Sequence, residues 1–159
     1  MKTRRMAFVA GLAALALLIL SAAGPAGAGE MRGMAKGQTM YAPSYPFVPY
    51  GPKSRPMKLN STLCIRNLDI DDPITVGKIA YLDETGKELK QYLSQPLIIP
   101  PLGAVHYVAP EMDAKDMGHG FLLVWRAGKV VTAPLAQVVI VGTGGQQGIS
   151  FINEAVVIK

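Results

Sequence analysis

Two histidines and two methionines that lie close together in the chain form the strongest candidate for a chemical site. They are His106, Met112, Met117 and His119, which fall within fourteen residues. Thioether and imidazole groups together suit Cu(I) or Cu(II). These residues therefore predict a copper-binding loop. The other interpretation is that both histidines are ordinary loop or surface residues, because the chain has 8 methionines spread along its length.

A glycine-rich segment near the C-terminus imitates a nucleotide-binding turn. The apolar run 138–141 leads into Gly142-Thr143-Gly144-Gly145-Gln146-Gln147-Gly148. Dinucleotide binding needs a helix after this turn, to hold the pyrophosphate at its N-terminus, and an acidic residue about 20 positions later. Only residues 149–159 remain, and their pattern is that of a strand. The sequence therefore excludes a nucleotide site, and we expect a loop between two strands.

The residues needed for hydrolysis are not arranged for catalysis. A nucleophile requires a base within hydrogen-bond reach and a third group that orients the base. The chain has two histidines and no serine in a Gly-x-Ser-x-Gly context. Asp69, Asp71 and Asp72 precede Pro73, which is the pattern of a turn. Calcium binding is the alternative for these carboxylates, although the cluster lacks the glycine-spaced loop of a typical calcium site. We therefore expect no enzyme and no cofactor other than the copper alternative.

Five polar residues are candidates for a binding surface, because they fall at predicted strand ends and loops, where rigid scaffolds carry function. They are Arg66, Asn67, Asp69, Gln146 and Gln147. The alternative is structural. Asn67 and Asp69 would then cap a turn, and the two glutamines would bond to loop backbone.

The first 28 residues have the three parts of a secretory signal peptide. Cations at positions 2, 4 and 5 precede an apolar stretch from Met6 to Ala23, and Pro25 is followed by the small-residue site Ala26-Gly27-Ala28. We therefore expect a periplasmic or secreted protein. The alternative is an uncleaved membrane anchor, since the apolar stretch is at the lower edge of a spanning length.

Removal of this leader takes three cations away and lowers the net charge from +5 to about +2. Such a charge gives no reason to expect nucleic acid as a partner, because its binders cluster Lys and Arg on one face. The single cysteine, Cys64, cannot form an internal disulfide. Between Leu63 and Ile65 it is expected to be a small buried residue.

Residues 29–40 show no period, and we expect them to be flexible. An extended segment rich in Pro and Tyr follows at 41–56, with prolines at every third position from 43 to 52. One interpretation is a polyproline II ligand for a partner that recognises proline. The interpretation we favour is an extended edge segment packed on the domain.

Beyond this segment the hydrophobic pattern has a period of two. The predicted strands are 57–66, 74–82, 87–93, 104–108, 120–126, 130–131, 135–141 and 149–157. The residues between them are typical of turns, such as 83–86 and 127–129, or of an extended proline-rich crossover at 95–102. The sequence thus predicts an all-β fold, an Ig-like β-sandwich of about seven short strands that forms a single domain over 41–159.

Several short blocks are similar to a known bacterial family. They are Gly37-Gln38-Thr39-Met40-Tyr41, the block from Leu63 to Asp69, Pro73-Ile74-Thr75, the block from Tyr92 to Leu97, the block from Phe121 to Trp125, and Gly142-Thr143 with the block from Gln146 to Phe151. On these residues the chain resembles the family catalogued as domain of unknown function 3124, over roughly 37 to 159.

The resemblance implies that residues 41–52 belong to the domain, and that the domain is an extracytoplasmic module without assigned activity. It supplies no catalytic residues, and neither His106 nor His119 matches a family motif. The leading hypothesis is therefore an exported, non-enzymatic module that binds a protein or another cell-envelope component. The alternative is a periplasmic copper carrier that uses the His/Met loop.

Overall fold

The computed structural model of this chain describes residues 32–51, 53–109, 118–143 and 148–159. Within these ranges every regular element is a β-strand, and the strands pair antiparallel. The predicted all-β class is therefore confirmed. The predicted signal peptide lies outside the described residues. In the described part of the chain, no helix is long and apolar enough to cross a membrane.

The larger sheet has six strands, in the order β12-β1-β9-β5-β6, with β7 also paired to β5. Its strands are β1 (Met34–Pro43), β5 (Ile74–Leu82), β6 (Glu88–Gln91), β7 (Leu97–Ile99), β9 (Gly120–Thr132) and β12 (Val156–Val157). The first and last strands of the described chain therefore lie side by side in this sheet.

The second sheet has four strands in the order β11-β10-β4-β8. They are β4 (Asn60–Arg66), β8 (Ala104–Val108), β10 (Leu135–Gly142) and β11 (Ile149–Glu154). A separate two-stranded hairpin joins β2 (Phe47–Tyr50) to β3 (Arg55–Lys58).

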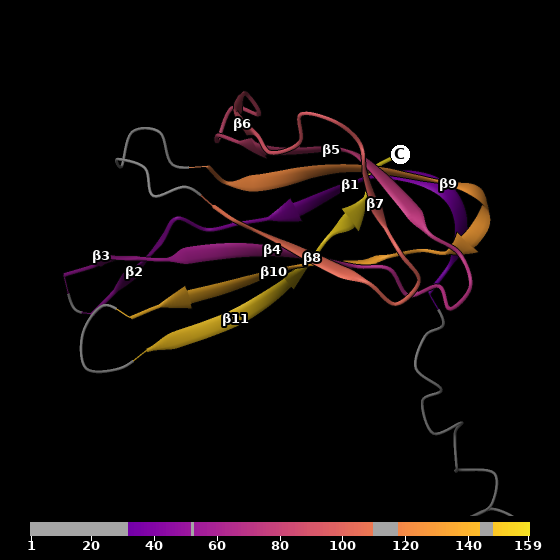
Figure 1. Cartoon of the computed structure of the whole chain (residues 1–159). Coiled ribbons are helices and arrows are strands. Elements are labelled where there is room, and N and C mark those ends of the chain that lie inside the picture. The colour runs from indigo at the N-terminus through magenta and orange to yellow at the C-terminus, as the bar shows by residue number, and fades with distance from the viewer. Residues whose placement is uncertain (1–31, 52, 110–117, 144–147) are drawn as a thin grey trace, which may run out of the picture. The chain divides into compact units, whose positions relative to one another are not determined.

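The two larger sheets form two layers of the unit 33–159 and share one hydrophobic core (Figure 1). Trp125 and Phe121 from the six-stranded sheet are buried in the same cluster as Leu63 and Ile140 from the four-stranded sheet. Alternation along each strand selects these residues, because successive side chains point to opposite faces. Burial of this apolar surface is the main stabilising contribution to the fold.

The number of strands differs from the prediction. Among the described residues there are twelve strands, where the sequence predicted about seven. Pro134 lies between β9 and β10, where the chain passes from one sheet to the other, and Ala155 marks a similar passage between β11 and β12. A predicted C-terminal strand over 149–157 is thus divided, because its two halves pair in different sheets.

Two local expectations are corrected. Residues 34–40 form the first part of β1, although their sequence shows no period, because they pair with β9; Met40 also pairs with β12. The predicted turn at 127–129 is instead part of the long strand β9. The register of β9 with β1 shifts at this place, from Arg126 opposite Gly37 to Val131 opposite Ala35, so residues 127–130 form an irregularity within the strand. By contrast, the turn at 83–86 forms as predicted, with Gly86 at a φ of 82°.

Candidate binding surface

The predicted site residue Asn67 is buried in the turn that carries the chain from β4 to β5. Its amide nitrogen donates to the carbonyl oxygens of Asp72 at 2.8 Å, Pro100 at 3.1 Å and Ile99 at 3.2 Å. Its amide oxygen accepts from the Asp69 N–H at 3.0 Å. These bonds occupy the polar atoms of the side chain within the fold, as the structural interpretation expects.

Asp69 completes the same turn. Its Oδ1 accepts from the N–H groups of Asp71 and Asp72 at 3.0 and 2.9 Å, and its Oδ2 accepts from the Thr132 N–H at 2.9 Å. These backbone donors, Thr132 first, lower the pKa of the Asp69 carboxyl, since they favour its ionised form. In the described part of the chain, no group of three acidic, histidine or cysteine side chains is placed to hold a metal ion.

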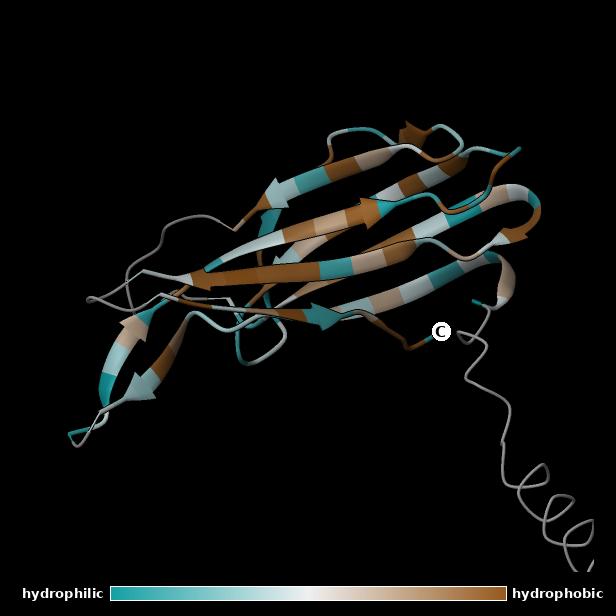
Figure 2. Cartoon of the chain, turned by 90° about the horizontal axis from the view of Figure 1, so that it is seen from below, coloured by the Kyte–Doolittle hydropathy of each residue, from teal (hydrophilic) through white to brown (hydrophobic). Residues whose placement is uncertain are grey.

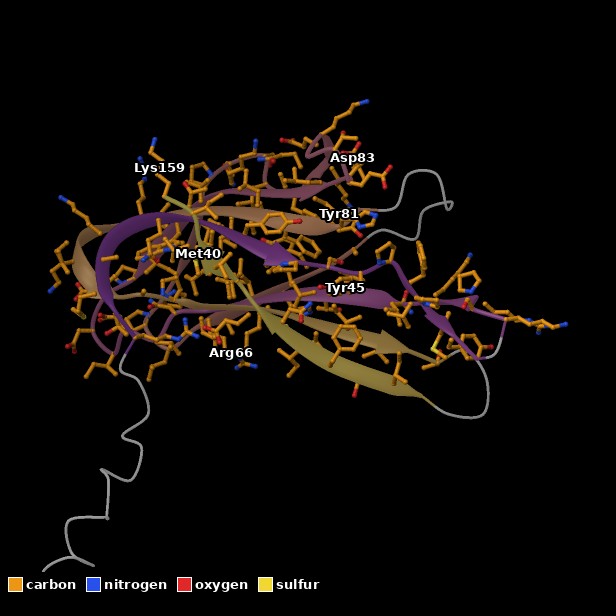
Figure 3. The ribbon with its side chains drawn as sticks, turned by 180° about the vertical axis from the view of Figure 1, so that it is seen from behind. Met40, Tyr45, Arg66, Tyr81, Asp83 and Lys159 are labelled. Atoms are coloured by element: carbon orange, nitrogen blue, oxygen red, sulfur yellow. The ribbon has the colours of Figure 1, made fainter. Side chains whose placement is uncertain are left out.

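Arg66 has a different environment. Leu63 and Ile65 of β4 are buried in the core, so Arg66 points to the outer face of the four-stranded sheet, where it is exposed. Figure 3 shows its side chain at this layer. Of the predicted binding residues that the structure describes, Arg66 is the one that a partner can reach. Gln146 and Gln147 lie outside the described residues.

His106 lies on the same outer face, directly opposite Cys64 in the pairing of β4 with β8. His106 is exposed and Cys64 is half-buried. The expectation that Cys64 is a buried residue is therefore wrong. The reason is the alternation of β4, which turns Leu63 and Ile65 inward and the residue between them outward.

His119 lies beside the other sheet, directly before β9. Its N–H donates to the Leu82 carbonyl at 2.7 Å, and its own carbonyl accepts from the Ser44 N–H at 2.8 Å and the Tyr41 hydroxyl at 3.2 Å. Of the two histidines of the predicted copper loop, His106 thus lies in the four-stranded sheet and His119 lies beside the six-stranded sheet. Met112 and Met117 lie outside the described residues, so the complete set stays a prediction.

The β2–β3 hairpin is a surface that the search for chemical motifs missed. It extends from one end of the two sheets (Figure 2). Its register places Phe47 opposite Lys58, and Tyr50 opposite Arg55. Both aromatic side chains lie directly across the hairpin from a cation, and Pro49 faces Pro56 between them.

The base of this hairpin is held firmly against the domain. Met57 and Leu59 at the base are buried, and the Leu59 N–H donates to the Pro46 carbonyl at 2.9 Å, which joins the two stems of the hairpin. A Cβ added to Gly142 of β10 would collide with Leu59 and approach the Met57 sulfur to 3.1 Å, so the glycine is required for this packing. The hairpin is therefore anchored at its base.

Tyr45 connects the segment before the hairpin to β11. Its ring lies 6.0 Å from that of Phe151, centroid to centroid, and Figure 3 shows it beside the four-stranded sheet. Even so, Tyr45, Phe47 and Tyr50 are 45%, 44% and 46% exposed. Aromatic rings normally supply large buried areas, so three half-exposed rings at one end of the domain make this region a candidate contact surface.

The cations of the hairpin are equally accessible. Lys53, Arg55 and Lys58 are exposed, and none makes a salt bridge with another described residue. The distribution of charge along the sequence also indicates this surface, without any motif. Residues 31–68 contain six Lys or Arg and no Asp or Glu.

Comparisons with known proteins show the family of the chain and leave its activity open. No curated protein matches the chain. The crystal structure of Thermotoga maritima 1070 is similar at a TM-score of 0.43 and 15% sequence identity, over 75% of this chain and 92% of that chain. A family model described as protein of unknown function (DUF3124) matches residues 37–158. The chain belongs to this family, as its sequence blocks predict.

Proposed function

We propose that this protein is an exported, non-enzymatic interaction module that contacts another component of the cell envelope through the β2–β3 hairpin. The observation that carries the proposal is the exposure of Phe47 and Tyr50, each opposite a cation on an anchored hairpin. Aromatic residues and arginine are enriched at binding interfaces.

We infer that the scaffold is an Ig-like sandwich. In that fold, strand B pairs with E in one sheet and strand C pairs with F in the other. The pairs β4–β8 and β5–β9 have this relation. The places beside them are taken by β10 and β1, so the order at the sheet edges differs from that of an antibody domain. Loops and hairpins at the ends of such sandwiches commonly form binding sites.

A photo-crosslinking residue placed at position 47 or 50 of the full chain tests the proposal in intact cells. The control positions are Ile98 and Ile70, which are 65% and 72% exposed but lie away from the hairpin. We expect crosslinks to an envelope component, protein or lipid, from Phe47 and Tyr50 and none from the controls. Equal yields from all four positions would contradict the proposal.

A copper carrier is the second candidate, and one observation favours it. Cys64 and His106 lie directly opposite each other on the outer face of the four-stranded sheet. The pair places a thiol beside an imidazole, and both groups are ligands for copper. Titration with Cu(I) tests this function, with Cys64→Ala and His106→Ala as variants. Binding that is unchanged by either variant, or that requires more than micromolar copper, would exclude a site at this pair.

A further inference from the structure

We propose that the β2–β3 hairpin docks on the anionic surface of a lipid bilayer. This inference rests on the proposed function and names the envelope component that the hairpin contacts. It follows from the charge of the hairpin, from the kind of apolar residue that accompanies the charge, and from the shape of the element.

The charge of the chain is strongly divided. Residues 31–68 carry six Lys or Arg without an acid, whereas residues 69–159 carry seven Lys or Arg and ten Asp or Glu. Three of the six cations, Lys53, Arg55 and Lys58, lie on the hairpin and have no described acidic partner. Outside the hairpin, residues 31–159 carry ten Lys or Arg and ten Asp or Glu, so their formal charge is zero. An anionic surface therefore attracts the hairpin and has no net attraction for the rest of the domain, which orients the protein as it approaches.

The apolar residues of the hairpin suit the boundary between lipid and water. Phe47 and Tyr50 are about half exposed, with a cation directly across the ladder from each. A tyrosine places an apolar ring among acyl chains and its hydroxyl among headgroups, and the stems of Lys and Arg follow apolar surface while their charges stay in water. The same residues can therefore contribute both apolar burial and headgroup contacts.

The backbone of the hairpin argues against a protein partner that adds a strand. Pro49 and Pro56 face each other at the middle of the ladder, and neither has an N–H to donate. Proline in this place blocks pairing along the edge of a strand. Contacts through this hairpin must then be made by side chains. A narrow projecting hairpin reaches a flat surface, such as a bilayer, more readily than it forms a concave pocket for a ligand.

Vesicle binding by the full chain tests the proposal. We compare phosphatidylcholine vesicles with vesicles that contain about one third phosphatidylglycerol, at low and at physiological salt. The hairpin charge variant is Lys53→Gln, Arg55→Gln and Lys58→Gln. It should lower the partition coefficient on anionic vesicles by roughly 100-fold, at about 5-fold for each cation.

The matched control removes the same charge elsewhere, by Lys36→Gln, Lys87→Gln and Lys159→Gln. These three lysines are exposed and lie on the six-stranded sheet, in the turn before β6, or at the C-terminus. All variants keep the same N-terminal leader, so any affinity of the leader for lipid is common to them. Equal losses in the two charge variants would overturn the proposal.

A second readout does not depend on the total affinity. Trp125, the one tryptophan of the chain, is 1% exposed, so its emission reports the core. Tyr50→Trp adds an indole on the hairpin, and Ile98→Trp adds one on β7 as a control. The emission of the Tyr50→Trp variant should shift to the blue on anionic vesicles, and that of the Ile98→Trp variant should stay constant.

The results separate this inference from the proposed function. If the indole at the hairpin keeps its aqueous emission on bound vesicles while Phe47 crosslinks to a protein in cells, lipid docking is overturned and the interaction module stands. If the hairpin variant loses affinity for a soluble polyanion and keeps its affinity for vesicles, lipid docking is also overturned. If the hairpin charge variant binds anionic vesicles as well as the wild type does, and positions 47 and 50 give no crosslinks in cells, both proposals are overturned.

Discussion

The Thr132 N–H donates a 2.9 Å hydrogen bond to Oδ2 of Asp69, across 63 residues of sequence. Each partner lies where the chain changes sheets. Asp69 is in the turn from β4 to β5, and Thr132 is the last residue of β9, shortly before β10. One carboxylate therefore connects two passages between the layers.

This bond predicts a defined pH dependence of stability. Because backbone donors lower the pKa of Asp69 in the folded state, its contribution is complete above about pH 4, the ordinary pKa of aspartate. The contribution is lost as the pH falls through the lowered folded-state pKa. Asp69→Asn removes the titrating group and should flatten the dependence of the urea midpoint on pH below about 4.

The control for this measurement is Asp71→Asn, because Asp71 is exposed and no described residue bonds to its carboxylate to hold the turn. Asp83 has a lowered pKa as well, owing first to the Thr85 hydroxyl, so the Asp69 variant should keep a residual slope. A pH profile that is identical in the Asp69 variant and the wild type would contradict this assignment.

Asn67→Ala tests whether this residue acts in folding or in binding. The side chain is 1% exposed and donates to three backbone carbonyls, which the variant leaves without that partner. The free energy of unfolding should fall by about 1–3 kcal/mol, measured by urea denaturation. Arg66→Ala, at an exposed neighbour, should change it by less than about 0.5 kcal/mol. An unchanged stability in Asn67→Ala would return this residue to the candidate binding surface.

Gly118→Ala should destabilise the fold, because a Cβ there collides with the buried ring of Tyr81, whose hydroxyl donates to the Gly118 carbonyl at 2.8 Å. The expected loss is about 1–3 kcal/mol in the free energy of unfolding, as for other overpacked sites. Gly128→Ala is the matched control, since nothing lies within 4 Å of its added Cβ. Equal stability of the two variants would show that Tyr81 does not hold the position shown here.

The sequence predicted the fold class well because the core strands alternate. Four inward residues of β4 and β10 are apolar and fully buried, namely Leu63, Ile65, Val138 and Ile140. The same alternation contradicts burial of Cys64. The prediction was wrong because it assigned Cys64 the burial of its sequence neighbours, which point to the opposite face of the strand. The strand β1 was harder to predict, since it carries no period and gains its order from pairing with β9.

The candidate site was predicted only in part. Asn67 and Asp69 were singled out as polar residues at a strand end, and the same feature fits a structural turn, which is where the structure places them. The hairpin was not found by motif, because its function would depend on exposure and on the pairing of Phe47 with Lys58. Neither can be deduced from spacing along one strand.

Export by a cleaved signal peptide is tested by the N-terminus of the protein recovered from cells. The Ala26-Gly27-Ala28 site predicts that the chain begins at Gly29, and that the protein is found outside the cytoplasm. Ala28→Leu should slow processing, because the peptidase accepts small residues at the site. A protein that keeps residues 1–28 and stays with the membrane would support the uncleaved anchor instead.

The most direct test of the account is the share of the exported protein that sediments with envelope membranes. It should be compared between the wild type, the hairpin charge variant and the matched control variant. We predict that the wild type and the control sediment alike, and that the hairpin charge variant is released into the soluble fraction, since its three cations are lost from the contact surface. Sedimentation of the hairpin charge variant to the same extent as the wild type would contradict the central claim that this hairpin is the surface by which the protein contacts the envelope.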